Sequence, residues 1–300
     1  MAVEQQDLRV FNGEGELYLR RKVKKSGKFK AVLFLHGVTL PSSSCFDLDI
    51  EGYSWANYLA LEGFDVFLLD FRGYGLSYKP EDKGKLVCSV EEALTDVKAA
   101  IEHILSMLGT STICLVGWSW GACLAGLCAE KLSSIVERVL LHAPGFKENT
   151  SLALELEPKE LLLKSSGYVE VTADDFKRRW LREVSYEGQV DKNVLEYLIA
   201  RLFRNGVVRV PSGPWLSIYE MYRRKKPLFN PEGIKCPVLI TRGEYDNFAL
   251  QNDVIELFHS ILVSHKQLAL LQGGGHFIHL ERERLKLYKL SSFFLHEETI

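Results

Sequence analysis

The sequence has 300 residues, of which 47% are hydrophobic and 25% charged, and its formal net charge at pH 7 is −2. This length suffices for one large α/β domain with an insertion, and the nearly balanced charge excludes the basic surface of a nucleic-acid-binding protein. No apolar run reaches the ~18 residues of a membrane span, and the amino terminus lacks the charged start and apolar core of a signal peptide. Six scattered cysteines without metal-ligand spacing fit reduced thiols. We therefore expect a cytoplasmic protein that binds neither nucleic acid nor membrane.

Helices alternate with short, apolar strands along the chain, which predicts a mostly parallel sheet covered on both faces. Two strands at 17–23 and 31–35 are predicted to form a hairpin-like pair around a polar turn at 24–27. The helix at 89–107 has Ser89 and Glu92 in the pattern of a capping box. The other predicted core elements are helices at 55–62, 121–131 and 281–296 and strands at 64–70, 111–118 and 136–142.

A Gly-Trp-Ser-Trp-Gly motif at residues 117–121 joins an apolar strand to a helix. In such a tight turn the two glycines let the backbones pass, and the Ser119 hydroxyl is lifted clear of the sheet. The backbone N–H of Trp120, at the start of the helix, can then face an oxyanion. We interpret Ser119 as a nucleophile. The simpler interpretation is a glycine-flanked turn whose serine caps the helix.

A serine nucleophile needs a base, and the base needs a carboxylate that orients it. On a sheet with this turn the carboxylate follows the serine along the chain. The apolar strand that begins at residue 237 runs into a Gly-Glu-Tyr-Asp loop, where open parallel sheets bind ligands. We predict Asp246 as the carboxylate, because Gly243 opens the turn and Asp246 closes it. Glu244 is the alternative.

The predicted base is His276, which directly follows three glycines at the end of an apolar strand. Such a loop can place an imidazole against a serine on a neighbouring strand. His279 lies three residues further on, and we interpret it as structural. The order Ser119, Asp246, His276 is the one expected for a sheet with this turn.

A second oxyanion donor is expected from the loop after an early strand. The strand at 31–35 ends in His36-Gly37, and the glycine permits the backbone angles that turn the next N–H inward. The N–H of Val38 is therefore the second candidate donor, beside that of Trp120. His36 is predicted to order the loop by hydrogen bonding and not to act as a base.

These motifs, together with Asp-Phe-Arg-Gly-Tyr-Gly-Leu-Ser at 70–77, resemble those of the α/β-hydrolase superfamily over roughly residues 15–298. The resemblance implies a sheet of the eight-stranded type covered by helices on both faces. The segment at 70–77 is similar to a loop of lipid- and ester-cleaving members, and the long stretch at 39–55 is similar to a bacterial subgroup of hydrolases. In this superfamily, epoxide hydrolases and haloalkane dehalogenases carry an aspartate at the position of Ser119, and dienelactone hydrolases carry a cysteine.

The strand pattern stops between residues 145 and 235, and helices are predicted there at 158–164, 172–183, 192–203 and 214–224. The resemblance implies a helical lid at this place, so we predict a core of residues 1–145 and 233–300 and a lid of residues 146–232. A lid shapes the acyl pocket and excludes water. Large apolar side chains are expected either to face that pocket or to pack the lid on the core: Trp180, Tyr197, Phe203, Trp215, Ile218, Tyr219 and Tyr222.

The sequence thus predicts a serine hydrolase that cleaves an ester or thioester of a small-to-medium apolar acyl group. Ser119 attacks the carbonyl, His276 takes its proton, and Asp246 holds the imidazole. The N–H groups of Val38 and Trp120 bind the oxyanion. The expected partner is this small-molecule substrate, and the chemistry requires no cofactor and no metal.

Two alternatives stay open. In an aminopeptidase or amidase, an acidic lid residue holds the substrate amine, and Glu155, Glu157 and Glu160 are equal candidates. In a ligand receptor, the same fold binds its ligand and turns it over rarely. The rings of Trp118 and Trp120 are expected either to wall the cleft or to pack beneath neighbouring strands.

Overall fold

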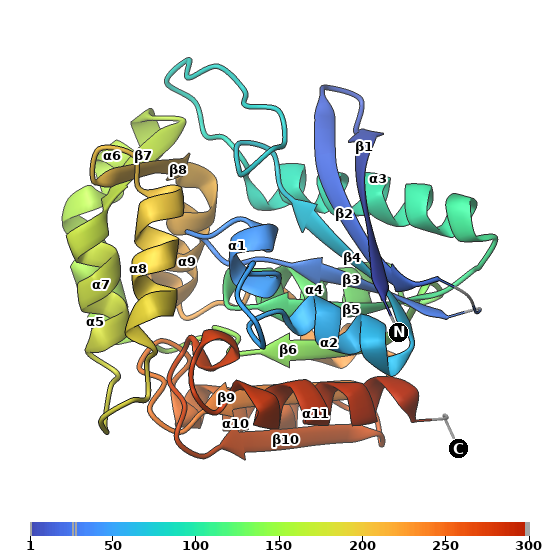
Figure 1. Cartoon of the computed structure of the whole chain (residues 1–300). Helices are drawn as coiled ribbons and strands as arrows, with labels where there is room; N and C mark the ends of the chain where they lie inside the picture. The colour runs from blue at the N-terminus through green and yellow to red at the C-terminus, as the bar shows by residue number, and fades with distance from the viewer. Residues whose placement is uncertain (1, 26, 28, 298–300) are drawn as a thin grey trace.

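The computed structural model describes residues 2–297 except 26 and 28, and its main sheet has the order β1-β2-β4-β3-β5-β6-β9-β10 (Figure 1). β1 runs antiparallel to β2, and β2 runs antiparallel to β4, whereas every other neighbouring pair is parallel. This confirms the predicted mostly parallel, eight-stranded sheet. The strands are β1 (Val3–Phe11), β2 (Glu16–Lys24), β3 (Lys30–Leu35), β4 (Phe64–Asp70), β5 (Ile113–Trp118), β6 (Val136–His142), β9 (Val238–Gly243) and β10 (Lys266–Leu271).

Helices cover both faces of this sheet (Figure 1). One face carries α2 (Trp55–Glu62) and α11 (Arg284–His296), and the other carries α3 (Val90–Leu108), α4 (Trp120–Lys131) and α10 (Gln251–Ser260). The short helix α1 (Ser42–Phe46) follows β3. Because both faces are covered, β4 and β5 are buried at every position, which explains their continuously apolar sequences. The predicted capping box of α3 is present.

The predicted pairing of the strands at 17–23 and 31–35 is wrong. β2 pairs with β1 and β4, while β3 lies between β4 and β5. β1 was not predicted, because most of its side chains are exposed and polar at this edge of the sheet. A tight turn, in which the Asn12 N–H donates to the Gly15 carbonyl, makes β1 the hairpin partner of β2. Ser26, in the predicted turn at 24–27, lies outside the described residues.

Between β6 and β9 the chain leaves the sheet, and we call residues 143–237 the insertion. Its helices fall where they were predicted, with an additional short helix before them. The insertion also contains an antiparallel ribbon of two five-residue strands, which was not predicted because such short alternating segments give a weak signal. Its elements are α5 (Thr150–Leu156), a 3₁₀ turn (Glu157–Lys159), α6 (Glu160–Ser165), β7 (Tyr168–Thr172), α7 (Ala173–Leu181), α8 (Lys192–Leu202), β8 (Val207–Pro211), α9 (Ser212–Arg224) and a 3₁₀ turn (Pro231–Gly233).

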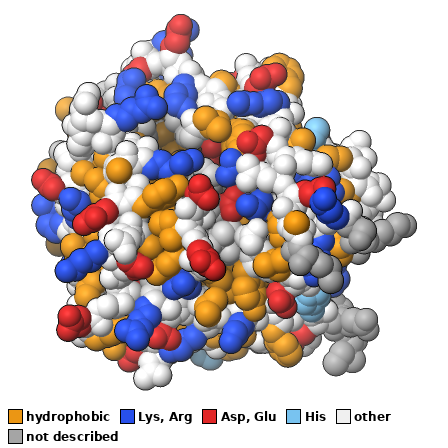
Figure 2. Space-filling view, in the orientation of Figure 1, with side chains coloured by type: hydrophobic (Ala, Val, Ile, Leu, Met, Phe, Trp, Pro, Cys, Tyr) orange, Lys and Arg blue, Asp and Glu red, His pale blue; other side chains and the backbone are white. Residues whose placement is uncertain are grey.

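Acidic and basic side chains are interspersed over the face of the molecule shown in Figure 2, in keeping with the small net charge. All six cysteines are buried with free thiols, and burial raises the pKa of each of them. Within the described part of the chain, no helix is long and apolar enough to cross a membrane.

Candidate active site

Ser119 lies at a sharp turn between β5 and α4, with a φ of 58° and a ψ of −122°. This conformation is strained for a residue with a side chain, and the surrounding backbones hold it in place. A Cβ added to Gly117 would collide with the backbone of Gly121 and Ala122, and one added to Gly121 would collide with the carbonyl of Leu35. The two glycines of the motif are therefore required by the close approach of β5, α4 and β3.

We expect Gly121→Ala to destabilise the fold by about 3 kcal/mol or more, because the added methyl group meets backbone atoms that cannot move aside. Urea denaturation followed by circular dichroism measures the change in the free energy of unfolding. The matched control is Gly233→Ala, whose methyl group meets only the flexible side chain of Glu130 within 3 Å. Equal stability of the two variants would contradict the prediction.

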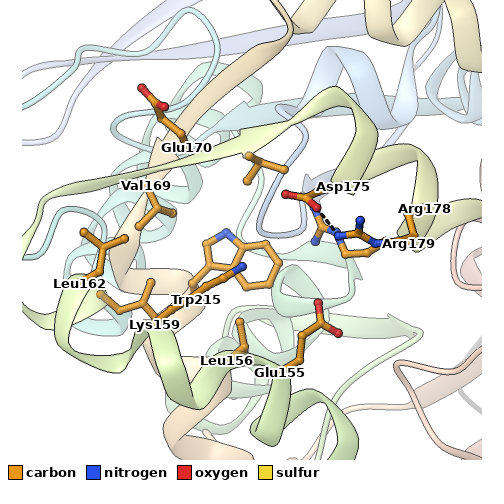
Figure 3. A pocket seen from close by; sticks show the side chains of 12 residues that line it. Glu155, Leu156, Lys159, Leu162, Val169, Glu170, Asp175, Arg178, Arg179 and Trp215 are labelled. Carbon is orange, nitrogen blue, oxygen red and sulfur yellow. Dashed lines mark hydrogen bonds and ion pairs between the residues drawn. The ribbon is translucent and has the colours of Figure 1, made fainter.

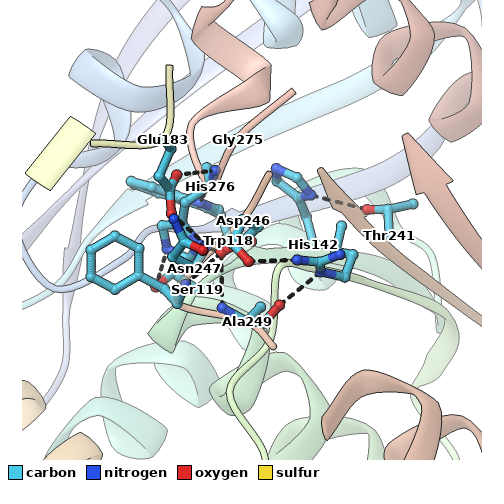
Figure 4. A network of polar contacts seen from close by, with 12 residues as sticks. Trp118, Ser119, His142, Glu183, Thr241, Asp246, Asn247, Ala249, Gly275 and His276 are labelled. Carbon is cyan, nitrogen blue, oxygen red and sulfur yellow. Dashed lines mark hydrogen bonds and ion pairs between the residues drawn. The ribbon is translucent and has the colours of Figure 1, made fainter. Parts of the chain in front are cut away.

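The three predicted catalytic side chains form one hydrogen-bonded chain (Figure 4). His276 Nε2 lies 2.9 Å from Ser119 Oγ, and His276 Nδ1 lies 3.0 Å and 3.1 Å from the two carboxylate oxygens of Asp246. Ser119 is half-buried, whereas the histidine and the aspartate are buried. The Trp118 indole N–H donates to the His276 carbonyl over 2.9 Å and so supports the histidine loop.

The geometry distinguishes Asp246 from Glu244, the alternative candidate for the carboxylate that orients the imidazole. Oδ1 of Asp246 also accepts hydrogen bonds from the N–H groups of Phe248 and Ala249, each over 2.8 Å, which fixes the carboxylate beneath the imidazole. Glu244 instead accepts from the N–H of Gly273 over 2.9 Å. Its carboxylate thus braces the glycine loop and makes no contact with the imidazole.

His279 is fully buried away from this chain of hydrogen bonds. Its ring packs against Trp118, with 4.4 Å between ring centroids, and neither ring nitrogen has a partner among the described residues. Burial lowers the pKa of His279 well below 6.5, so the ring is neutral. These contacts fit the structural role predicted for it.

Burial and neighbouring charge have opposing effects on the pKa of Asp246 and on the pKa of His276. Burial raises the pKa of Asp246, but the imidazole and the backbone N–H donors outweigh it, so that the pKa lies below 3.8. Burial lowers the pKa of His276, but the Asp246 carboxylate outweighs it, so that the pKa lies above 6.5. The pair therefore favours an imidazole that readily takes a proton.

The two predicted oxyanion donors flank Ser119. Trp120 is the first residue of α4, so its backbone N–H has no acceptor within the helix. Val38 lines the same cleft as Ser119, and the Tyr74 hydroxyl fixes its loop by donating to the Val38 carbonyl over 2.8 Å. His36 Nδ1 lies 2.7 Å from the Gly37 carbonyl oxygen, and its Nε2 accepts from the backbone at position 71 over 3.3 Å, so this ring orders the loop.

Two buried carboxylates that the sequence did not single out hold the histidine loop, and Figure 4 shows the first of them, Glu183. Glu183, from the insertion, accepts from the N–H groups of His276 and Asn247, each over 2.6 Å, and so bridges the histidine and aspartate loops. Glu281 accepts from the N–H of Gly275 over 2.8 Å. Burial, followed by the nearby charge of Asp246, raises the pKa of Glu183 to about 7.

A cleft of about 50 Å³ opens above Ser119 and is lined mainly by apolar side chains of the core and the insertion. Of the two tryptophans beside the serine, Trp118 lines this cleft, whereas the Trp120 ring packs on Phe71 and donates to Ser217 Oγ over 2.9 Å. Among the described residues, no cluster of His, Cys, Asp or Glu could hold a metal ion. Of the seven large apolar side chains expected either to face the pocket or to pack the lid on the core, Trp215, Ile218 and Tyr222 line the cleft. The insertion also contributes Ala143, Gly145, Leu152 and Arg179.

Known proteins share this architecture. An enol-lactonase from Burkholderia xenovorans LB400 is 20% identical with a TM-score of 0.67, and the match covers 97% of this chain and all of that one. A thermophilic esterase from Thermogutta terrifontis is 17% identical with a TM-score of 0.68, covering 97% and 98%. Mouse (Mus musculus) epoxide hydrolase 3 is 28% identical over 274 residues, which are 84% of this chain and 67% of that protein.

The sheet, its helices and the similarity to these solved structures define the α/β-hydrolase fold. Residues 29–283 match the model of the hydrolase family described as "Serine aminopeptidase, S33". The chain belongs to this family.

Proposed function

We propose that this protein is a serine hydrolase that cleaves a carboxylic ester or thioester of a small-to-medium apolar acyl group. His276 takes the proton of Ser119 as its oxygen attacks the substrate carbonyl, and Asp246 stabilises the imidazolium that forms. The N–H groups of Val38 and Trp120 stabilise the oxyanion, to which one such donor typically contributes about 3 kcal/mol. The histidine then protonates the leaving group, and water releases the acid from the acyl-enzyme.

The observation that carries this proposal is the continuous hydrogen-bonded chain from Ser119 through His276 to Asp246 at the base of an apolar cleft. A buried carboxylate behind the imidazole and a serine held at a strained turn are the arrangement that acyl transfer requires. We further propose that residues 146–232 act as a lid, since side chains of this segment line the cleft over the serine.

An aminopeptidase fits the cleft less well than an esterase, although the family description names that activity. None of the three candidate amine-binding acids is among the residues that line the Ser119 cleft. Glu155 pairs with Arg182, Glu160 accepts from the Tyr219 hydroxyl, and Glu157 is exposed. The charged side chain that does line the cleft is a cation, Arg179, which repels a substrate ammonium group.

Epoxide opening, the activity named for the mouse relative, is also disfavoured. The superfamily resemblance places an aspartate nucleophile in epoxide hydrolases, and the residue at this turn is Ser119. A serine that attacks an epoxide forms an ether, which water does not readily cleave, whereas an acyl-enzyme is hydrolysed. Ser119 therefore favours a carbonyl substrate.

The test is steady-state hydrolysis of 4-nitrophenyl esters of increasing acyl length, beside an amino-acid anilide and styrene oxide. We expect sustained ester turnover with an optimum at a short or medium chain, and labelling of Ser119 by a fluorophosphonate, located by mass spectrometry. A single burst followed by near-stasis would instead indicate the ligand receptor. Faster cleavage of the anilide or the epoxide than of every ester would overturn the proposal.

We expect kcat/KM for esters to fall at acid pH with a midpoint above 6.5, because only neutral His276 can take the serine proton and its pKa is raised. The protonated, inactive form therefore accumulates as the pH falls through this raised value. A pH–rate profile measures the midpoint. The pKa of Glu183 is also raised to about 7, in part by Asp246. The control is therefore Glu183→Gln, in which the fall in rate at acid pH should persist because His276 still titrates.

A further inference from the structure

A cavity of about 160 Å³ lies inside the insertion, beside the Ser119 cleft (Figure 3). Arg179 and Trp215 line both spaces, so the insertion cavity and the cleft meet at this pair of side chains. The walls come from α5, α6, β7, α7 and α9, and their apolar part consists of Leu156, Leu162, Leu163, Val169, Val171 and Trp215.

The Arg179 guanidinium has no hydrogen-bond acceptor and no carboxylate within ion-pairing distance among the described residues. It lies over the face of the Trp215 ring, with 5.0 Å between Cζ and the ring centroid. Burial lowers the pKa of Arg179 to about 10, so the side chain still carries its charge at neutral pH. A guanidinium presents five N–H donors, and in this structure those of Arg179 point to no acceptor.

The acidic side chains near Arg179 form ion pairs with other arginines. Asp175 pairs with Arg178, as the dashed line in Figure 3 shows, and Glu155 pairs with Arg182 over 3.4 Å. Both carboxylates lie close enough to stabilise the charge on Arg179 without contacting it. The insertion cavity is also lined by Lys159 and Glu170. Arg179 is the lining arginine that neither of the nearby acids pairs with.

A second donor among the residues that line both spaces lacks an acceptor. The Trp215 side chain is buried, with 8% of the residue exposed, and its indole Nε1 has no partner among the described residues. A buried N–H without a partner costs free energy, so native proteins rarely leave one unless a ligand or water completes it. The half-buried, charged Arg179 and the buried Trp215 indole thus both line the insertion cavity and the Ser119 cleft.

We propose that Arg179 and Trp215 form an anion-binding subsite, and that the substrate is an ester carrying a carboxylate at some distance from its scissile carbonyl. The inference rests on the proposed function and narrows its substrate class. A carboxylate matches the planar fork of a guanidinium and can also accept from an indole N–H. The apolar walls of the cleft and the cavity suit the methylene chain between the two groups.

The test compares monomethyl esters of dicarboxylic acids of increasing length with methyl esters of the corresponding monocarboxylic acids. We expect kcat/KM of the wild type to favour the anionic ester by about 10- to 100-fold at the best length. Arg179→Met should abolish this preference, so that the variant hydrolyses the anionic and the neutral ester with similar kcat/KM, and Trp215→Phe should reduce the preference about tenfold. Arg224→Met is the matched control, because this exposed arginine of α9 pairs with Glu220 and lines neither the cavity nor the cleft, and it should keep the wild-type preference.

Different outcomes separate this inference from the proposed function. Wild-type turnover of both esters at equal rates overturns the anion subsite and leaves the esterase in place. Equal loss of both rates in Arg179→Met, with no rescue by Arg179→Lys, shows a structural role and likewise overturns it. Absence of turnover for both esters, together with absence of fluorophosphonate labelling, overturns the proposed function and the subsite with it.

Discussion

Replacing Ser119 by alanine is expected to reduce kcat/KM for ester hydrolysis by a factor of about 10⁵–10⁶. The variant loses the oxygen that His276 Nε2 contacts over 2.9 Å, and with it the acyl-enzyme route. The oxyanion donors and the cleft remain, so a small residual acceleration over water should persist. The measurement is the initial rate with the best chromogenic ester from the length series.

Two controls accompany this variant. Ser260→Ala changes a serine on α10 whose hydroxyl donates to the carbonyl at position 256, so its rate should equal that of the wild type. A fluorophosphonate should label the wild type and the Ser260→Ala variant but not Ser119→Ala. Undiminished hydrolysis by Ser119→Ala would place the nucleophile elsewhere and contradict the proposed mechanism.

Asp246→Asn is expected to lower kcat by a factor of about 10⁴ while leaving KM nearly unchanged. An asparagine in this place can present an N–H to His276 Nδ1, which favours the tautomer whose Nε2 carries a proton and cannot accept one from Ser119. The buried site also loses the charge that stabilises the imidazolium. Michaelis–Menten kinetics at a pH above the His276 midpoint separate kcat from KM.

Glu244→Gln is the matched control for this variant. Glu244 lies two residues from Asp246, but it accepts from the Gly273 N–H and does not contact the imidazole. Its amide variant keeps an acceptor there, so kcat should stay within a few-fold of wild type, as for most substitutions outside reacting groups. A larger loss in Glu244→Gln than in Asp246→Asn would reverse the assignment of the orienting carboxylate.

The side chains around Ser119 could be predicted because each feature that places them is visible in a short stretch of sequence. Steric contact demands glycine at positions 117 and 121, and the strand-to-loop transitions before Asp246 and His276 place both residues at one edge of the sheet. Chain order alone then assigns three roles to three residues. The edge strand β1 was missed for the opposite reason, since an exposed polar strand has no apolar period to detect.

Glu183 and Arg179 could not be predicted, because what distinguishes them arises only in the folded chain. The N–H groups that Glu183 binds lie 64 and 93 positions away in the sequence. Arg179 stands between Arg178 and Arg182 in one polar stretch, and only the structure shows that these two arginines have acidic partners whereas Arg179 has none among the described residues. A hydrogen bond between residues far apart in the sequence leaves no periodic pattern of residue types, and a missing ion pair leaves none either.

The bridge made by Glu183 bears on how such hydrolases can evolve and be engineered. This carboxylate belongs to the insertion by sequence, yet it holds the backbone of the loops that carry Asp246 and His276. A segment transplanted from a relative to change substrate preference would therefore also replace a support of these two loops. Grafted insertions that keep an acidic residue at the position of Glu183 should retain turnover. The insertion and the two loops are therefore expected to diversify together and not as interchangeable modules.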